Sequence, residues 1–280
     1  MYEFICSIIN EKEIIRKDMS ALGNYEIDIY IPSKKLGIEY NGSYWHSTLK
    51  KKVKYHQNKT IAGAKRGVRI IHIFDYEWHN INKKEKIKSL LKHALIGDSI
   101  KIYARDTKVI KVESTELREF LDKYHLQGYT SSSVNLGLQY RDELVGVMTF
   151  GVPRFDKENQ YELIRMAWKS DTVVVGGTEK LFKHFITEYK PLSIITYSDI
   201  TKLTGNTYPK LGFKVDCILD PNYVWVNPNN FEVFTRYQTM KHKLVESGLG
   251  DESQTEDSIM EGLGFLKVYD CGNLKLSWRI

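Results

Sequence analysis

Two short strands and a polar turn are expected around Leu36-Gly-Ile-Glu-Tyr-Asn-Gly-Ser-Tyr-Trp-His-Ser-Thr-Leu-Lys50. An alternating strand over 26–32 ends at a proline, a second strand over 36–40 follows a lysine-bearing turn, and a third is expected over 67–74. Asp28 and Glu39 each lie between apolar neighbours, so on a period of two both carboxylates point away from those neighbours. On adjacent strands the two carboxylates would meet. This pattern predicts an oxygen-rich site for Mg²⁺ or another divalent cation, which polarises a phosphodiester and activates water.

Polar residues that follow the second strand extend this predicted site. Asn41 and His46 supply polar and proton-transfer chemistry within seven residues of Glu39. A helix is expected over 55–66 with Gly67 as its C-cap, which places His56 and Lys59 on one face. The alternative is that Asp28 and Glu39 are ordinary outward-facing charges on a two-faced sheet.

The first 95 residues or so resemble a known nuclease branch. The matching segments are Asp28, Gly37 to His46, Tyr55 to Thr60 and Lys65 to Trp78, and Gly42-x-Tyr44-Trp45-His46 matches the Gly-x-aromatic-Trp-His segment. This pattern is similar to the phage-borne domains related to very-short-patch repair endonucleases, within the PD-(D/E)XK superfamily. The resemblance implies a restriction-endonuclease-like mixed sheet with flanking helices. It also implies metal binding by Asp28 and Glu39, and an active-site role for His46.

One position, Asn41, departs from that family pattern in two respects. Asn41 stands where repair enzymes of this kind have a further histidine, and where the superfamily has its usual lysine. Lys59, on the next segment, would take the place of that lysine. The catalytic set predicted from the sequence is therefore Asp28, Glu39, Asn41, His46 and Lys59.

Positive charge is concentrated in the same part of the chain. Residues 1–98 hold 18 Lys and Arg against 11 Asp and Glu, whereas residues 99–280 hold 23 against 24. A lysine run follows His46 directly, where a phosphate backbone entering the predicted site would lie. We expect double-stranded DNA to be the partner, with contacts from Lys50, Lys51, Lys52, Lys54 and His56. The alternative for the lysine run is a solvated face.

The composition is typical of a globular protein, with 280 residues, 42% hydrophobic content and 12% aromatic content. No run approaches eighteen apolar residues, and the first residues lack a basic signal region, so we expect neither a membrane span nor a secretory signal. Cys6, Cys217 and Cys271 show no C-x-x-C spacing, which argues against disulfides and structural zinc. The expected compartment is the cytoplasm of a bacterial cell that hosts a phage or mobile element.

A second domain is expected over 99–280, after a boundary at Gly97-Asp98. The expected elements are strand-like residues 101–112, a helix over 114–124, a hairpin over 138–150, strands over 161–168 and 192–198, a helix over 179–189, and closing strands over 265–270 and 274–278. Residues 247–258 are polar and acidic, and an exposed excursion is expected there.

This second half resembles the GNAT acetyltransferase fold, and more closely the α+β domain of phage DNA-modification proteins of the Mom type. The residues that carry the resemblance are Gly146 to Gly151, Val175 to Thr178, Tyr197 to Asp199 and Asn206 to Phe213. The family's phosphate loop separates its glycines, whereas Gly176 and Gly177 are adjacent. We therefore expect no acetyl-CoA site, and either no cofactor or a different one.

The sequence favours a metal-dependent DNA endonuclease of the homing or mobile-element type, with the second domain positioning the DNA or a partner. The alternative is a GNAT-type transferase that modifies DNA bases and grips DNA with its N-terminal domain. A third possibility is a binding protein with an inactive nuclease fold. The recognition sequence, the metal and the oligomeric state are not specified by these patterns.

Overall fold

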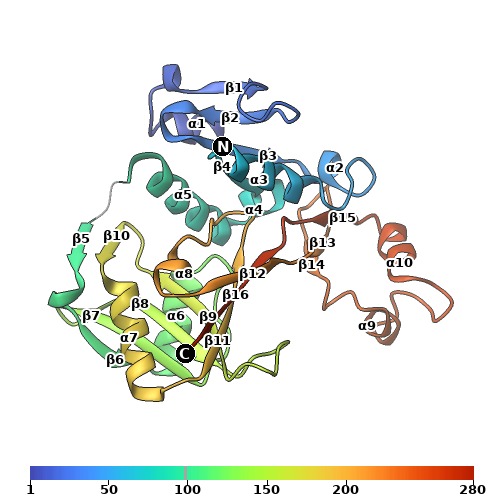
Figure 1. The fold of residues 1–280 in the computed structure, drawn as a ribbon. Helices are drawn as coiled ribbons and strands as arrows, with labels where there is room; N and C mark the ends of the chain where they lie inside the picture. The colour runs from blue at the N-terminus through green and yellow to red at the C-terminus, as the bar shows by residue number, and fades with distance from the viewer. Residues whose placement is uncertain (98–99) are drawn as a thin grey trace. The chain divides into compact units, whose positions relative to one another are not determined.

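The strands that carry Asp28 and Glu39 are neighbours in the computed structural model, which describes residues 1–97 and 100–280. They belong to a four-stranded sheet of order β1-β2-β3-β4 (Figure 1). The strands are β1 Ile15–Asp18, β2 Ile27–Ile31, β3 Leu36–Asn41 and β4 Arg69–Phe74. Pairs β1–β2 and β2–β3 are antiparallel, and β3–β4 is parallel. The three predicted strands are thus confirmed, and β1 is an addition at the edge.

Helices flank this sheet where the sequence changes period. They are α1 Tyr2–Cys6, α2 Ser43–His46, α3 Tyr55–Lys65 and α4 Asp75–His79, followed by α5 Ile81–Ile96. Helix α3 approaches β4 closely at Gly63, where an added Cβ would lie 2.8 Å from the Val68 carbonyl oxygen. The α3 helix was predicted from its sequence; it ends at Lys65 with Arg66 as its C-cap, and Gly67, the predicted C-cap, follows with a φ angle of +70°.

The contacts divide the chain into two units, each built from separated segments. Unit 1 comprises Met1–Lys84, Asp199–Thr204 and Ile218–Asn273, and unit 2 comprises Glu85–Ser198, Gly205–Cys217 and Leu274–Ile280. The predicted division at residue 98 gives two continuous domains. Each of the two units, in contrast, consists of three segments that alternate along the chain. That division stays a prediction about which pieces fold alone.

Unit 1 also contains a three-stranded sheet from the later part of the chain. Its order is β14-β13-β15, formed by Val233–Thr235, Tyr223–Val226 and Leu266–Tyr269. Helices α9 Lys241–Glu246 and α10 Glu256–Gly262 pack with Trp225, which is fully buried. The predicted acidic excursion therefore runs into α10. The first of the two predicted closing strands belongs to unit 1, because β15 pairs with β13.

Unit 2 is built on a seven-stranded sheet of order β12-β16-β11-β9-β8-β7-β6. The strands are β6 Lys108–Lys111, β7 Val134–Tyr140, β8 Glu143–Gly151, β9 Tyr161–Trp168, β11 Ser193–Asp199, β12 Lys214–Ile218 and β16 Asn273–Arg279. A parallel pair, β5 Ile100–Tyr103 and β10 Thr172–Val175, stands beside it. The strand expected over 101–112 is therefore two strands, separated by the 3₁₀ turn Ala104–Asp106.

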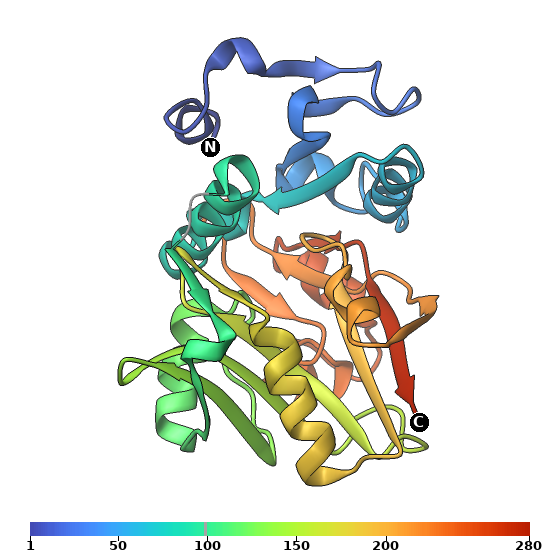
Figure 2. The same ribbon diagram turned by 60° about the vertical axis from the view of Figure 1, so that its left-hand side comes forward.

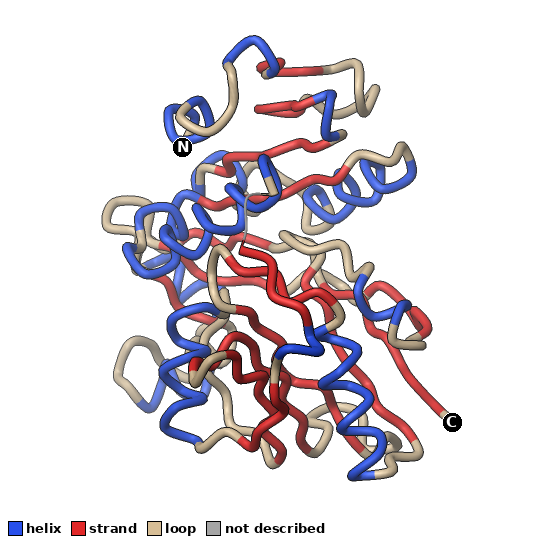
Figure 3. Tube along the Cα trace, turned by 90° about the vertical axis from the view of Figure 1, so that its left-hand side faces the viewer, coloured by secondary structure: helices blue, strands red, loops and turns tan. Residues whose placement is uncertain are grey.

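Helices cover both faces of the large sheet, as the packing of two successive residues of β8 shows. Met148 packs in the cluster that contains Phe185 of α7 Gly177–Tyr189, whereas Val147 packs with Leu117 of α6 Ser114–Tyr124. Because neighbouring strand residues point to opposite faces, α6 and α7 lie on opposite sides. Figures 2 and 3 show α7 running along the strands of its face. The chain is thus a mixed α/β protein.

Three of the predicted elements of unit 2 match closely. Helix α6 and strand β9 have the predicted bounds, and the β7–β8 hairpin turns at Arg141 and Asp142, both of which have positive φ angles. Helix α7 begins two residues earlier than predicted, at Gly177. Of the helices within residues 1–97 and 100–280, none has the length and apolar character needed to cross a membrane.

Candidate functional site

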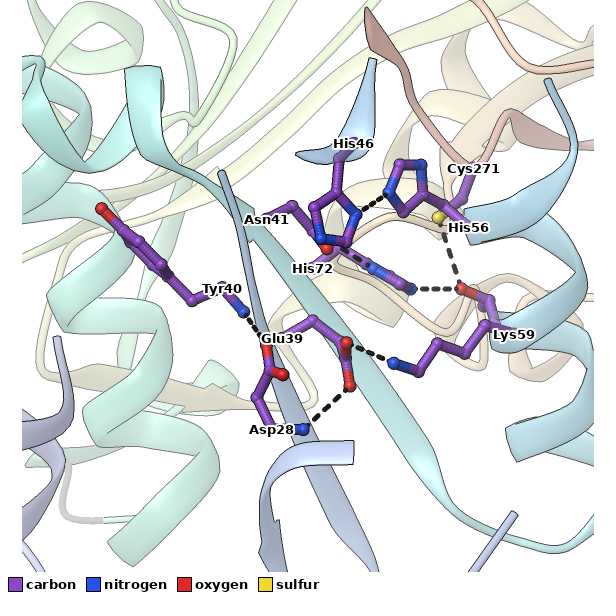
Figure 4. A network of polar contacts seen from close by, with 10 residues as sticks. Asp28, Glu39, Tyr40, Asn41, His46, His56, Lys59, His72 and Cys271 are labelled. Atoms are coloured by element: carbon purple, nitrogen blue, oxygen red, sulfur yellow. Dashed lines mark hydrogen bonds and ion pairs between the residues drawn. The ribbon is translucent and has the colours of Figure 1, made fainter. Parts of the chain in front are cut away.

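Asp28, Glu39 and Lys59 lie together in unit 1, on β2, β3 and α3 (Figure 4). The Asp28 amide donates to Glu39 Oε1 at 3.4 Å, and the Tyr40 amide donates to Asp28 Oδ2 at 2.8 Å. Lys59 Nζ forms an ion pair with Glu39 Oε2, and both side chains are almost fully buried. The structure therefore brings together both predicted carboxylates and the predicted lysine. Their catalytic and metal-binding roles stay predictions.

The position of Glu39 differs from the expected outward-facing strand residue. Glu39 is 2% exposed, because β3 is covered by neighbours on both edges and by α3. This burial raises the pKa of Glu39 to about 7, against the opposing effect of the Lys59 ammonium.

His46 and His56 form a second polar group with a defined proton arrangement. His56 Nδ1 lies 2.9 Å from the Tyr269 carbonyl oxygen, which only accepts hydrogen bonds, so this nitrogen carries the hydrogen. Neutral His56 then accepts at Nε2 from His46 Nδ1, at 2.8 Å. His46 is left with an unprotonated Nε2. Burial, followed by the neighbouring charges, lowers the pKa of His46 to about 3.

A buried chain of polar side chains supports the same sheet, and most of it was not predicted from the sequence. Asn41 Nδ2 donates to His72 Nδ1 at 3.3 Å, and His72 Nε2 lies 3.0 Å from Thr60 Oγ1. Thr60 in turn donates to Cys271 Sγ at 3.3 Å. Asn41 Oδ1 is buried without a hydrogen-bond partner within the described residues. The signal for His72 was a lone imidazole inside the otherwise apolar strand Arg69–Phe74.

The predicted DNA-contacting lysines lie on the segment 43–54, which follows β3 and which we call the lysine loop. Lys50, Lys52 and Lys54 are exposed, and Lys51 is half-buried with its Nζ 4.1 Å from the Tyr55 ring centroid. Trp45 is 65% exposed and Tyr44 is 46% exposed, and the Lys50 ammonium lies over both rings. His56, by contrast, is buried within the His46 pair. The lysine loop thus presents cations beside exposed aromatic rings.

A second group of polar residues lies in unit 2, where β9 and β11 diverge. The two strands are parallel and pair over Tyr161–Leu163 and Ile194–Thr196, although β9 continues to Trp168 and β11 to Asp199. A register shift between Thr149 and Phe150 of β8 leaves Ile164 of β9 without an opposing residue. We call the stretches of β9 and β11 beyond these three pairs the strand gap.

Side chains around the strand gap are polar and partly unpaired. The Tyr208 hydroxyl, on α8 Thr207–Lys210, hydrogen-bonds the Thr196 side chain, and burial raises the pKa of Tyr208. Ser198 Oγ and Thr149 Oγ1 are buried without a partner in the part of the chain that the structure describes. Of these residues, Tyr208, Ser198 and Thr149 lie in segments that the sequence had singled out for the GNAT resemblance, although no site role was assigned to any of them. Thr196 lies outside those segments.

The chain is similar to known proteins at the level of structure alone. No family model matches the chain, and no curated protein matches it. Among the solved structures, a Bacillus subtilis acetyltransferase in complex with CoA is similar at a TM-score of 0.37 and 14% identity, covering 62% of this chain and 99% of that one. The ribosomal-protein-S18-alanine N-acetyltransferase from Escherichia coli gives 0.36 and 12%, covering 62% of this chain and 94% of that one.

A GNAT family acetyltransferase from Elizabethkingia anophelis with acetyl-CoA bound is also similar, at a TM-score of 0.36 and 14% identity. The similarity covers 62% of this chain and 99% of that chain. These similarities agree with the predicted GNAT-like domain, and at these scores they identify neither a substrate nor a cofactor.

The prediction that this chain is a metal-dependent DNA endonuclease is corrected by that comparison. The solved structures to which this chain is similar are described as acetyltransferases, and one of them as a GNAT family acetyltransferase. The Glu39 carboxylate is paired with Lys59. Within residues 1–97 and 100–280, no three His, Cys, Asp or Glu side chains form a group suited to a metal ion.

Proposed function

We propose that this chain is a GNAT-type group transferase that modifies a DNA base, with unit 2 carrying the transfer chemistry and unit 1 gripping the DNA. The observation that carries the proposal is the strand gap, where two parallel strands separate beside a bulge and leave buried hydroxyls unpaired. Diverging strands expose backbone groups that a ligand has to satisfy. A bound acyl donor with an extended thioester arm would satisfy them.

The residues of the gap fit the acyl end of such a donor. When bound, a thioester supplies an activated acyl group. Tyr208 would hold a proton at its hydroxyl, because burial raises its pKa, and so would be able to protonate a leaving group. Glu162 on β9 is 7% exposed, and its carboxylate would accept the proton of an amine acceptor.

The fit at the phosphate end of acetyl-CoA is weaker. Gly176 is exposed and precedes α7, so backbone amides face the place where a pyrophosphate would lie. The first turn of α7 adds a negative charge from exposed Glu179, and its Lys180 is held by the Ala104 and Thr107 carbonyl oxygens. A shorter thioester, such as an acyl-pantetheine, therefore belongs in the test beside acetyl-CoA.

The lysine loop is the feature that supports DNA as the acceptor. Exposed lysines provide the sequence-independent attraction to phosphates, and the exposed Trp45 and Tyr44 rings offer faces on which bases stack. Glu39 and Lys59 are almost fully buried, so they would act in this function by supporting the sheet that carries the loop.

The test is incubation of the full chain with duplex DNA and a labelled acyl donor, followed by digestion to nucleosides and mass spectrometry. We expect an acylated base, and we expect Tyr208→Phe to slow its formation by about 10²-fold, since general acid catalysis contributes on that order. Tyr189→Phe, a partly buried tyrosine in the same core, is the matched control. No adduct with either thioester would overturn the proposal.

A further inference from the structure

Two arginines of unit 2 lie close together on the sheet face opposite α7. Thr149 and Arg165 are paired residues of β8 and β9, so their side chains leave the sheet on the same side. Met148 points to the α7 side, and Thr149 therefore points away from it. Arg154 follows the end of β8, and its backbone amide donates to Glu162 Oε2 at 3.1 Å. We call Arg154, Arg165 and Thr149 the arginine face.

Backbone carbonyl groups hold Arg165 in a fixed orientation. Its Nε donates to the Gly128 carbonyl oxygen at 3.2 Å, and its Nη1 donates to the Ile164 carbonyl oxygen at 3.1 Å. The loop that supplies Gly128 also supplies Thr130, whose hydroxyl accepts from Arg154 Nη2. Both guanidinium groups are thus fastened to one loop, while donors on each remain available.

The charge of this face is not balanced within the protein. Among the described residues, neither Arg154 nor Arg165 forms an ion pair with an acidic side chain. Glu162 is the nearby carboxylate, and it already accepts from the Arg154 amide. Burial and then the Arg154 charge lower the pKa of Arg165, as expected for two like charges held near each other.

A second observation points to a ligand on the same face. Thr149 is fully buried, and its hydroxyl has no partner within residues 1–97 and 100–280. Leaving a buried hydroxyl unpaired costs about 1–3 kcal/mol, so its presence opposite Arg165 on the neighbouring strand calls for an acceptor from outside the chain. An oxyanion supplies acceptors for the hydroxyl and for both guanidinium groups at once.

We propose that the arginine face binds a phosphate group of the nucleic-acid strand that carries the acceptor base. This inference rests on the proposed function for the choice of a nucleic-acid phosphate, and it deepens that function by assigning the residues that position the acceptor. Two guanidinium groups with a hydroxyl match the several oxygens of a phosphate. The phosphate would fix the strand while the base reaches the strand gap.

Calorimetric titration of the full chain with a nucleoside 5′-monophosphate tests the proposal without any acyl donor. We expect saturable binding that the unphosphorylated nucleoside does not show. Arg165→Gln should weaken this binding by roughly tenfold, and Arg165→Lys should restore only part of it, because lysine lacks the planar fork. Lys169→Gln removes the same charge from unit 2 at a residue paired with Glu143, and it should leave the affinity unchanged.

Thr149→Val keeps the volume and removes the hydroxyl. We expect this variant to bind the nucleotide several-fold more weakly while unfolding at a higher urea concentration than wild type, because an unpaired buried group is gone. The gain in stability shows that the variant is folded and so makes its binding result interpretable.

Three outcomes would overturn the proposal. The first is equal affinity for the nucleoside and its monophosphate, the second is unchanged affinity in Arg165→Gln, and the third is equally tight binding of inorganic phosphate, which would assign the site to a free ion. Because no transfer step is measured, a chain that binds the nucleotide but acylates no base would leave this inference standing and reject the proposed function.

Discussion

The Glu39–Lys59 pair is the most buried ionic contact in the part of the chain that the structure describes. Only 2% of the Glu39 side chain and 3% of the Lys59 side chain are exposed. Removing water from both charges is costly, and their attraction repays that cost only while both partners are present. The free energy of unfolding therefore depends on the contact between Glu39 of β3 and Lys59 of α3.

Lys59→Met should destabilise the chain strongly, because it leaves a buried carboxyl without its cation. We expect a loss of about 3 kcal/mol at pH 8, and a smaller loss at pH 5, where Glu39 is protonated. The double variant Glu39→Gln/Lys59→Met should recover most of the loss. Urea unfolding of the three proteins measures this cycle, and equal losses in the single and double variants would contradict the role of the pair.

His56 should make the free energy of unfolding decrease as the pH falls. Burial lowers the pKa of His56 to about 4, so its contribution is present above the ordinary value of 6.5 and is lost as the pH falls toward the folded-state value. Between pH 7.5 and pH 5 this amounts to about 2 kcal/mol. In His56→Gln, the difference in the free energy of unfolding between these two pH values, measured by urea unfolding, should be smaller than in the wild type by that amount. The exposed His242 gives the control, and an equal decrease in His242→Gln would reject this explanation.

The part of this site that could be predicted from the sequence depends on local alternation of residues along two strands. Alternation over Glu26–Pro32 and Leu36–Tyr40 predicted that Asp28 and Glu39 would face the same way on adjacent strands, and the amide contact between them agrees. Alternation says nothing about what covers that face. The burial of Glu39 and the pairing of His72 with Asn41 depend on α3 and β4, which pack from elsewhere in the chain.

Helix α3 depends on a glycine that the sequence alone does not explain. An added Cβ at Gly63 would meet the Val68 carbonyl oxygen and Ile70 Cγ1, each at 2.8 Å. Gly63→Ala should therefore cost about 1–3 kcal/mol, despite the better helix propensity of alanine. Gly262 of α10 has open space, and Gly262→Ala should stabilise by about 0.5–1 kcal/mol. Thermal unfolding distinguishes the two, and a stabilising Gly63→Ala would contradict the close packing.

The lysine loop makes a prediction of its own about DNA binding. If Lys50 and Lys52 contact phosphates, changing both to Gln should reduce the slope of log K against log salt by about 0.9 for each lost contact. Fluorescence anisotropy with a labelled duplex at several salt concentrations measures the slope. Lys12 and Lys65, which lie on other elements of unit 1, supply the control pair. An unchanged slope in the loop variant would mean that these lysines form a solvated surface.

Long-range pairing explains why the organisation of the whole chain was harder to predict than its elements. The helix over 114–124 and the strand over 161–168 were predicted with their observed bounds, because each has a local pattern. The entry of Asp199–Thr204 and Ile218–Asn273 into unit 1 has no such pattern. Contacts such as the His72 amide with the Thr201 carbonyl join residues 129 positions apart.

A fragment consisting of residues 1–98 should therefore lack cooperative unfolding. It would keep the four-stranded sheet but lose Lys202 beside Glu77, Tyr269 beside His56 and the β13–β15 sheet. Circular dichroism during urea unfolding measures this directly. A sharp transition, with the same dependence of the unfolding free energy on urea concentration per residue as the full chain, would show that the segment folds alone. The division at residue 98 predicts this outcome.

The threading of the chain through unit 1 also fixes an order of events during synthesis. A ribosome releases residues from the N-terminus onward, yet the last contacts of unit 1 come from residues near Asn273. His56 and Thr60 must therefore wait for their partners Tyr269 and Cys271 until the chain has been synthesised beyond Cys271. A premature stop codon anywhere between positions 218 and 273 would leave the first-made unit incomplete, so quality control can detect such a truncation through the part of the protein that was made first.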